Sequence, residues 1–316
     1  MYFNIIKKIA PILCFCIIIV SCEKEVNVDI PEHQPRLVAH CLFDDSGNWL
    51  VKLSLTKSIF DTLEAKYIND AVVELYENNS LKEVLTNRQN GIYRITSEAG
   101  FFPRAGNEYM LKVKHDLYPD IDAQEIFSDK PEILDCYLDA SQRVVRNNIY
   151  GYNLILTINN LSLESEYYFV KLTRDIVPQS NFEYNGLIYL AGDTIYDQIV
   201  HFHIPESVDL HRCHLTNWFF HDDFFNGTSY TIEILIDENY LFETVKLDVG
   251  VYKINEILYK YGINYANFYD AEGLIGFAGQ TLGFTNPSET ITNCNGGYGI
   301  FAGLSGNNYQ IELNQY

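Results

Sequence analysis

Histidines gather in one short stretch of the chain, and their spacing suits metal binding. Five of the eight histidines fall between residues 201 and 221, and Cys213 lies among them. Residues i and i+2 of a β-strand point to the same side, which pairs His201 with His203 and His211 with Cys213. If the chain reversed direction between the pairs, the four side chains could hold zinc or copper. Histidines on the exposed side of a hairpin would have the same spacing.

Catalytic motifs are scarce elsewhere. His221, Asp222 and Asp223 include a base and two carboxyl groups, but Asn226 and Gly227 shortly after them are typical of a two-residue hairpin turn. The sequence has no HExxH, GxSxG or Walker A motif. We therefore expect a protein that is not an enzyme and has no cofactor. The alternative is a surface hydrolase or metal-dependent enzyme that uses the histidine cluster.

Aromatic residues beside the histidines offer a binding surface. Trp218, Phe219, Phe224 and Phe225 follow one another closely. Such side chains at the edge of a β-sandwich can stack on sugars or anchor a protein partner. Packing in the hydrophobic core is the alternative, because most large aromatic residues are used in that way.

Residues 1–21 have the pattern of an export signal. Lys7 and Lys8 precede an apolar run that is shorter than the roughly 20 residues needed to span a bilayer. The segment ends in Ile-Val-Ser-Cys, which resembles a bacterial lipobox and predicts acylation of Cys22. The alternative is a single transmembrane anchor.

Residues 22–35 are a polar stretch that we expect to act as a tether. Glu23, Lys24 and Glu25 follow Cys22 and are similar to the surface-export signal of Bacteroidota lipoproteins. Acyl chains contribute about 0.8 kcal/mol for each buried CH₂ group, so several chains hold a protein on a membrane durably. We expect a lipid-anchored outer-membrane protein that faces the cell exterior, with the periplasmic face as the alternative.

Charge and composition narrow the class of partner. The net charge is −20, which repels nucleic acid and anionic lipid headgroups and argues against a nucleic-acid partner. Hydrophobic residues make up 47% of the chain, with 24 Tyr and 19 Phe, so the chain can bury large cores.

Four cysteines follow Cys22, namely Cys41, Cys136, Cys213 and Cys294. Four cysteines permit three disulfide pairings, and an oxidising compartment allows disulfides to form. Buried free thiols are the alternative.

The fold that we expect is mainly β. In residues 36–128, short alternating runs separated by polar turns predict an Ig-like or prealbumin-like β-sandwich. The runs are residues 36–43, 49–55, 71–77, 80–85, 91–96, 109–115 and 121–127. Residues 129–316 form the second predicted domain, with strands at 152–159, 167–174, 187–191, 199–204, 229–236, 242–247, 298–302 and 309–313.

One amphipathic helix interrupts this β-rich C-terminal domain. Asp248 is a suitable N-cap, and Gly262 suits the C-terminal stop. Between them, apolar residues recur at helical spacing, at Val251, Ile254, Ile257, Leu258 and Tyr261. These spacings predict a helix of about 13 residues packed on the sheet.

A glycine-rich motif near the C-terminus contains Asn293, Gly296, Gly297, Gly299 and Phe301. Together with the stretches at residues 25–31, 37–41, 71–75, 91–93, 106–113 and 222–227, it resembles a family of Bacteroidota outer-membrane lipoproteins, domain-of-unknown-function family 4249. The glycines permit a tight turn into a final strand, so a structural role is the favoured interpretation of the motif.

This resemblance implies an accessory role beside a TonB-dependent receptor, an outer-membrane β-barrel. The protein would capture a small-molecule, glycan or peptide ligand, or cap the transporter. It implies no catalytic residues. A structural or adhesive surface protein is the remaining alternative.

Overall fold

The computed structural model describes residues 33–58, 66–95, 100–146, 149–178, 182–184, 187–189, 195–198, 202–203, 211–212, 217–223, 227–271 and 290–313. The chain divides into two units, Met1–Gln34 and Pro35–Tyr316. Almost all described residues belong to the second unit. The signal segment, Cys22 and most of the tether lie outside the described residues.

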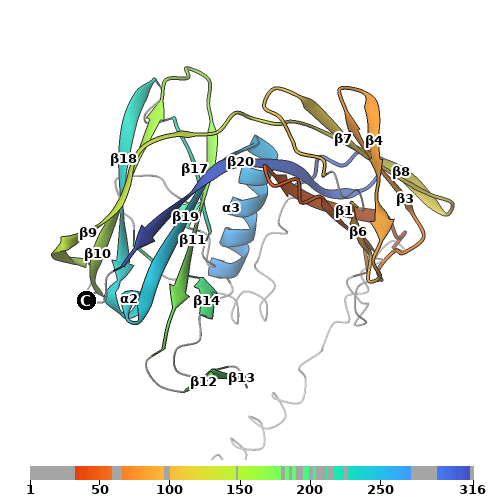
Figure 1. Cartoon of the computed structure of the whole chain (residues 1–316). Helices are drawn as coiled ribbons and strands as arrows, with labels where there is room; N and C mark the ends of the chain where they lie inside the picture. Colours follow the sequence, from red (N-terminus) through yellow and green to blue (C-terminus); the bar gives the residue numbers. More distant parts are fainter. Residues whose placement is uncertain are drawn as a thin grey trace, which may run out of the picture. The chain divides into compact units, whose positions relative to one another are not determined.

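The first part of this unit is a β-sandwich (Figure 1). One of its sheets contains β1 (Leu37–Asp44), β2 (Leu50–Leu55), β6 (Ile92–Arg94) and β5 (Thr86–Asn87). The other contains β4 (Ser80–Val84), β3 (Val72–Glu77), β7 (Glu108–His115) and β8 (Tyr118–Ile126). Leu37, Ala39, Cys41 and Phe43 alternate with more exposed residues along β1, and this alternation turns one side of the strand into the core.

Aromatic rings fill the centre of this first core. The ring of Phe43 lies 4.1 Å from that of Trp49, 5.7 Å from that of Phe127 and 5.1 Å from that of Phe301. Phe301 comes from the far end of the sequence, so the C-terminal segment contributes to the core of the N-terminal sandwich.

A second pair of sheets encloses another core. One contains β16 (His211–Arg212), β17 (Asn217–His221), β11 (Tyr167–Ile176), β19 (Thr244–Ile254) and β20 (Tyr298–Glu312). The other contains β15 (Phe202–His203), β18 (Thr228–Asp237), β10 (Ile149–Asn160) and β9 (Glu132–Arg146). Shorter elements are β14 (Ile195–Gln198), paired with β11, the pair β12 (Phe182–Tyr184) and β13 (Leu187–Tyr189), and helix α2 (Glu238–Leu241).

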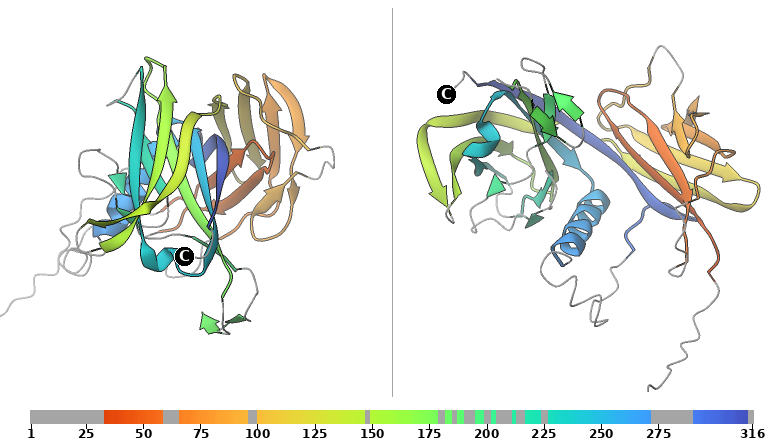
Figure 2. Two further views of the ribbon diagram at one scale, coloured as in Figure 1. Left: turned by 60° about the vertical axis from the view of Figure 1, so that its left-hand side comes forward. Right: turned by 90° about the horizontal axis from the view of Figure 1, so that it is seen from below.

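Strand β20 belongs to both sandwiches. Its residues from Tyr298 to Leu304 pair in parallel with β1, and those from Ser305 to Glu312 pair antiparallel with β19. Figure 2 shows this strand in dark blue joining the two groups of strands. The resulting sheet has ten strands. The mainly β prediction with an N-terminal sandwich is therefore confirmed, while the domain boundary after residue 128 stays a prediction.

The C-terminal end was predicted as two strands, at residues 298–302 and 309–313, but it is one. The two glycines between the runs lie within the strand, at positions where the sheet leaves no room for a side chain. A Cβ atom on Gly303 would lie 2.6 Å from the Phe127 ring, and one on Gly306 would lie 2.2 Å from the Val251 carbonyl oxygen.

The predicted helix exists, but its limits were wrong. Helix α3 spans Glu256–Ala271, and Asp248 lies within β19, opposite Gln310. The cap is Asn255, whose side-chain oxygen accepts a hydrogen bond from the Leu258 N–H at 2.7 Å. Gly262 lies inside the helix, where a Cβ atom would meet the Phe219 ring at 2.5 Å. Leu258 and Tyr259 pack on the sheet in a third cluster.

The predicted hairpin at Asn226 and Gly227 was also wrong. Strand β17 pairs with β11 in one sheet, whereas β18 pairs with β10 in the facing sheet. The connection therefore crosses from one sheet to the other. Gly227 supplies the positive φ of +74° in this connection, which explains the glycine without a hairpin.

Candidate functional site

The described backbone places two of the grouped histidines in strands of different sheets, and the metal site itself stays a prediction. His203 lies in β15, opposite Leu235 of β18, whereas His211 lies in β16, opposite Phe219 of β17. These strands belong to different sheets, so they do not form the hairpin that the metal-site hypothesis needed. His201 and Cys213 lie outside the described residues. Within the part of the chain that the structure describes, no group of three His, Cys, Asp or Glu residues could hold a metal ion.

The aromatic surface is only partly described. Phe219 is buried, and its ring lies 5.0 Å from that of Phe169. It packs in the core because the sheet that contains β17 is covered on both faces, by α3 on one side and by the second sandwich core on the other. Phe219 is therefore unavailable to a ligand, contrary to the binding hypothesis. The Trp218 side chain, Phe224 and Phe225 lie outside the described residues.

The three described cysteines are free thiols. Cys41 and Cys294 are buried in the first core, and Cys136 packs against the second. Burial raises the pKa of Cys294 to about 12, so its thiol is unreactive at neutral pH. These three cysteines match the alternative of buried free thiols, and Cys213 lies outside the described residues.

The glycine-rich family motif is packed against the first sandwich. Gly296 has a φ of +81°, and a Cβ atom there would lie 2.0 Å from the Asp120 carbonyl oxygen. Gly299 has a φ of +126°, and its Cβ atom would lie 1.8 Å from the Ala39 carbonyl oxygen. A Cβ atom on Gly297 would meet the Leu37 carbonyl oxygen at 2.5 Å. These glycines let the backbone approach β1 and β8, which is a structural task.

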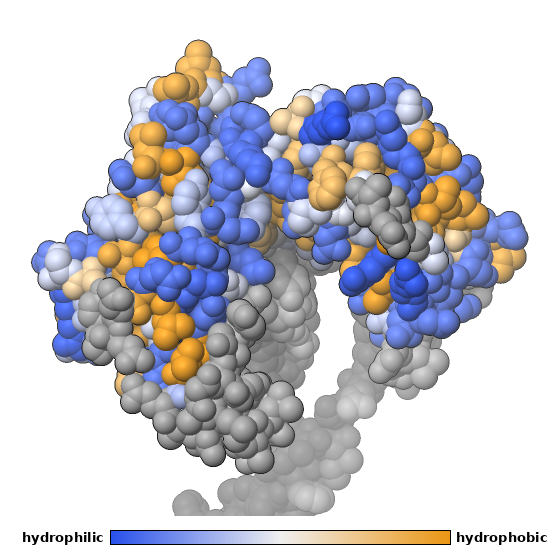
Figure 3. Space-filling view, viewed as in Figure 1, coloured by the Kyte–Doolittle hydropathy of each residue, from blue (hydrophilic) through white to orange (hydrophobic). Residues whose placement is uncertain are grey.

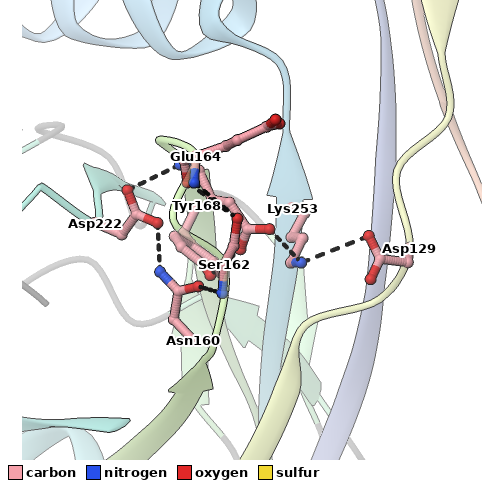
Figure 4. Close-up of polar contacts among 8 residues, drawn as sticks. Asp129, Asn160, Ser162, Glu164, Tyr168, Asp222 and Lys253 are labelled. Carbon is pink, nitrogen blue, oxygen red and sulfur yellow. Dashed lines mark hydrogen bonds and ion pairs between the residues drawn. The ribbon is translucent and has the colours of Figure 1, made fainter. Parts of the chain in front are cut away.

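Another group of polar residues converges at one end of the second sandwich. We call it the polar junction, and Figure 4 shows its side chains together. Its members come from the segment between β8 and β9, the end of β10, the loop at residues 161–166, β11, the residue after β17, and β19. They are Asp129, Asn160, Ser162, Glu164, Glu166, Tyr168, Asp222 and Lys253.

Asp222 is the centre of the polar junction and has no solvent exposure. Its Oδ2 accepts a hydrogen bond from the Asn160 side-chain amide, and its Oδ1 accepts one from the Glu166 N–H at 2.8 Å. The Asp222 N–H donates in turn to the Glu166 carbonyl oxygen at 3.1 Å. Burial raises the pKa of Asp222 above its ordinary value. Both oxygens are engaged, so this carboxyl group fastens the loop to the connection after β17.

The Glu166 side chain extends the network to β19. It accepts hydrogen bonds from the Tyr168 hydroxyl at 2.6 Å and from the Lys253 ammonium at 2.8 Å. The same ammonium lies 3.6 Å from Asp129. Burial, together with Glu166, raises the pKa of Tyr168, so the phenol stays a hydrogen-bond donor.

Ser165, Asp223 and His221 lie beside the polar junction but do not have the geometry of a catalytic triad. The Ser165 hydroxyl donates to Asp223 Oδ1 at 2.9 Å, and His221 Nδ1 lies 3.3 Å from Asp223 Oδ2. A nucleophilic serine needs a base that takes its proton, with the carboxylate on the far side of that base. Here the serine hydroxyl donates to the carboxylate itself, so the order of the three groups differs from that of a triad.

The network fixes a loop that displays two leucines. The Ser162 N–H donates to Asn160 Oδ1 at 3.0 Å, which sets the turn between Leu161 and Leu163. These leucines are 71% and 85% exposed. The loop joins β10 to β11 at the top of Figure 1, and Figure 3 shows hydrophobic surface over that end. These leucines were not predicted from the sequence, although two leucines that alternate with polar residues between strands were a usable signal.

The fold and this site define a class: a mainly β protein with two sandwiches that share one strand, carrying a hydrogen-bonded polar loop with an apolar tip. The model of the family DUF4249, described as a domain of unknown function, matches residues 23–310, and the chain belongs to this family. No curated protein matches the chain. Among the described residues, no helix has the length and apolar character required to cross a membrane.

Proposed function

We propose that the protein is a lipoprotein of the outer membrane that faces the cell exterior and serves a TonB-dependent transporter as a ligand-capture or capping partner. The observation that carries this proposal is the sequence Ile-Val-Ser-Cys at residues 19–22, followed by the polar stretch to residue 35. Acylation of Cys22 would anchor a body that folds as one unit from Pro35 onward.

The described surface supports a role in binding. Large apolar side chains exposed on a fixed loop are typical of interaction sites, since their exposure to water is unfavourable. The net charge of −20 keeps such a body apart from anionic lipid headgroups, so a protein or a neutral ligand suits it better.

Affinity purification of the full-length lipoprotein from membranes of its own cell tests the proposal. We expect a TonB-dependent outer-membrane barrel, identified by mass spectrometry, to purify with the wild-type chain. The Cys22→Ser variant should be absent from the membrane fraction and should not purify with the barrel. A wild-type purification that recovers no barrel would contradict the proposal.

A second candidate, a surface hydrolase or metal-dependent enzyme, rests on the spacing of the histidines in the sequence alone. Elemental analysis of the purified chain, together with ligand binding by the His201→Ala and His203→Ala variants, distinguishes the two candidates. Bound zinc or copper that both substitutions remove would favour the enzyme. For a structural or adhesive protein, a deletion strain would keep its nutrient uptake.

A further inference from the structure

We propose that Leu161 and Leu163 form a preformed docking tip for a protein partner that has an apolar recess bordered by lysine or arginine side chains. The inference deepens the proposed function, and it rests on that function only for the partner's location at the outer membrane.

The leucines of the tip are exposed, but the loop that carries them is held in place. Leu161 and Leu163 are 71% and 85% exposed, yet the loop that carries them is held by Asn160, which is 2% exposed, and by Asp222, which is fully buried. A loop that is already ordered loses little conformational entropy on binding. Its leucines can therefore enter a recess without rearrangement.

Residues on either side of the β17–β18 connection also support the tip. A Cβ atom on Gly227 would lie 3.1 Å from Leu163 Cδ2, so the residue that precedes β18 lies beside the tip. Asp222 joins this connection to the loop through Glu166. The tip is thus supported by two segments that are distant in sequence.

Charge selects the kind of partner. Carboxyl groups lie in the loop and among its hydrogen-bonded neighbours. Glu164 follows Leu163 and is exposed, and the Asp223 side chain, 58% exposed, accepts a hydrogen bond from the Ser165 hydroxyl. The Asp129 side chain, 80% exposed, lies 3.6 Å from the Lys253 ammonium. The cation of the polar junction, Lys253, has a side chain that is only 12% exposed and contacts Glu166 and Asp129. An acidic border disfavours an anionic lipid surface and matches a basic rim on a protein.

The test places a photo-crosslinking amino acid at position 163 of the full-length lipoprotein in its own cell. Leu117 is the matched control, because it is 80% exposed in the turn between β7 and β8. We expect position 163 to give one protein product, identified by mass spectrometry, and position 117 to give much less of it. Equal products at both positions, no product at 163, or a product with lipid alone would overturn the inference.

Direct binding to the purified partner completes the test. We expect Leu163→Asp to weaken the affinity at least about tenfold and Leu117→Asp to leave it unchanged. The wild-type affinity should fall as salt is added, because the rim is charged. Both variants should have the same melting temperature as the wild type, since both side chains are exposed. An unchanged affinity in Leu163→Asp would refute the docking tip.

The two proposals can fail separately. If the wild-type purification recovers a TonB-dependent receptor that position 163 does not crosslink, the docking tip is wrong and the proposed function stands. If position 163 crosslinks a protein that is not a barrel, the docking tip stands and the proposed transporter partnership is wrong.

Discussion

Asn293 brackets the backbone of Phe301: its side-chain amide donates to the Phe301 carbonyl oxygen at 2.7 Å, and its side-chain oxygen accepts from the Phe301 N–H at 2.9 Å. This pair of hydrogen bonds ties the segment before β20 to the strand itself. It lies where β20 pairs with β1, next to the aromatic centre of the first core. The C-terminal motif therefore closes the N-terminal sandwich.

Asn293→Ala should lower the free energy of unfolding by about 2 kcal/mol, because two partly buried hydrogen bonds are lost. Urea denaturation measures the change. Asn295→Ala is the control, since that exposed side chain makes one hydrogen bond, to Asp122, and we expect a loss below about 1 kcal/mol. Equal effects of the two substitutions would contradict the bracketing role.

Gly299→Ala should be far more damaging. The new Cβ atom would lie 1.8 Å from the Ala39 carbonyl oxygen and would force β1 and β20 apart, and the φ of +126° is unfavourable for alanine. Together these effects should cost at least about 3 kcal/mol. Gly106→Ala is the matched control, because Gly106 has a φ of +80° but nothing within 4 Å of its Cβ position, so we expect about 1 kcal/mol. Thermal melts of both variants give the comparison, and a mild effect at Gly299 would count against the close parallel pairing.

Glu125 should make stability depend on pH. Burial raises its pKa to about 8, while the Asn255 amide, which donates to this carboxyl group, opposes the rise. The folded protein keeps a proton that the unfolded chain releases above its ordinary pKa of 4.5. The stabilisation from this group is thus complete below about pH 4.5 and is lost as the pH rises towards 8.

Glu125→Gln removes this titration. As the pH rises from 5 to 8, the free energy of unfolding of the wild type should fall relative to that of the variant, by on the order of a few kcal/mol. Denaturation curves across that range measure the difference. The control is Glu132→Gln at an exposed carboxyl group of β9, which should follow the wild-type curve. Parallel curves for Glu125→Gln and the wild type would contradict a buried proton at this site.

Asp222→Asn should loosen the loop that carries the leucines. An amide in place of the carboxylate would set its N–H₂ against one of two donors, the Asn160 amide or the Glu166 N–H, which removes a buried hydrogen bond at a cost of about 2 kcal/mol. Hydrogen exchange should quicken at the Ser162 and Glu166 amides, which depend on this network. Asp223→Asn, at an exposed carboxyl group, should change neither amide much. Unchanged protection in Asp222→Asn would show that the loop is held by other contacts.

The strands of the first sandwich could be predicted because apolar and polar residues alternate along the sequence. Along β1, Leu37, Ala39 and Cys41 are buried and separated by more exposed residues, and a period of two has no helical interpretation. The predicted limits fall within three residues of the observed ones for β1 to β4 and for β6 to β8.

The start of α3 could not be predicted from the sequence, because the same apolar residues fit both the spacing of a strand and the spacing of a helix. Val249, Val251 and Ile254 are buried as members of β19, yet Val251, Ile254 and Leu258 also fit a helical spacing. Cross-strand pairing with β11 and β20 decides in favour of the strand, and such pairing is a long-range property that local spacing does not contain.

The polar junction was hidden for the same reason. Asn160 and Asp222 are 62 residues apart in the chain, and Lys253 reaches Glu166 across 87 residues. Asp222 was an acid–base candidate in the sequence, but its partner Asn160 was not predicted. Only the tertiary structure shows that both Asp222 side-chain oxygens accept hydrogen bonds that fasten a loop.

The central claim is that an acylated cysteine holds this β-rich body on the membrane, where its exposed loop can meet a partner. Labelling of the native cells with an alkyne analogue of palmitate tests it most directly, with the purified wild-type chain and the Cys22→Ser variant side by side. We predict label on the wild-type chain, a mature N-terminus at Cys22, and no label on the variant. A wild-type chain that carries no label, or whose N-terminus lies elsewhere, would contradict the account.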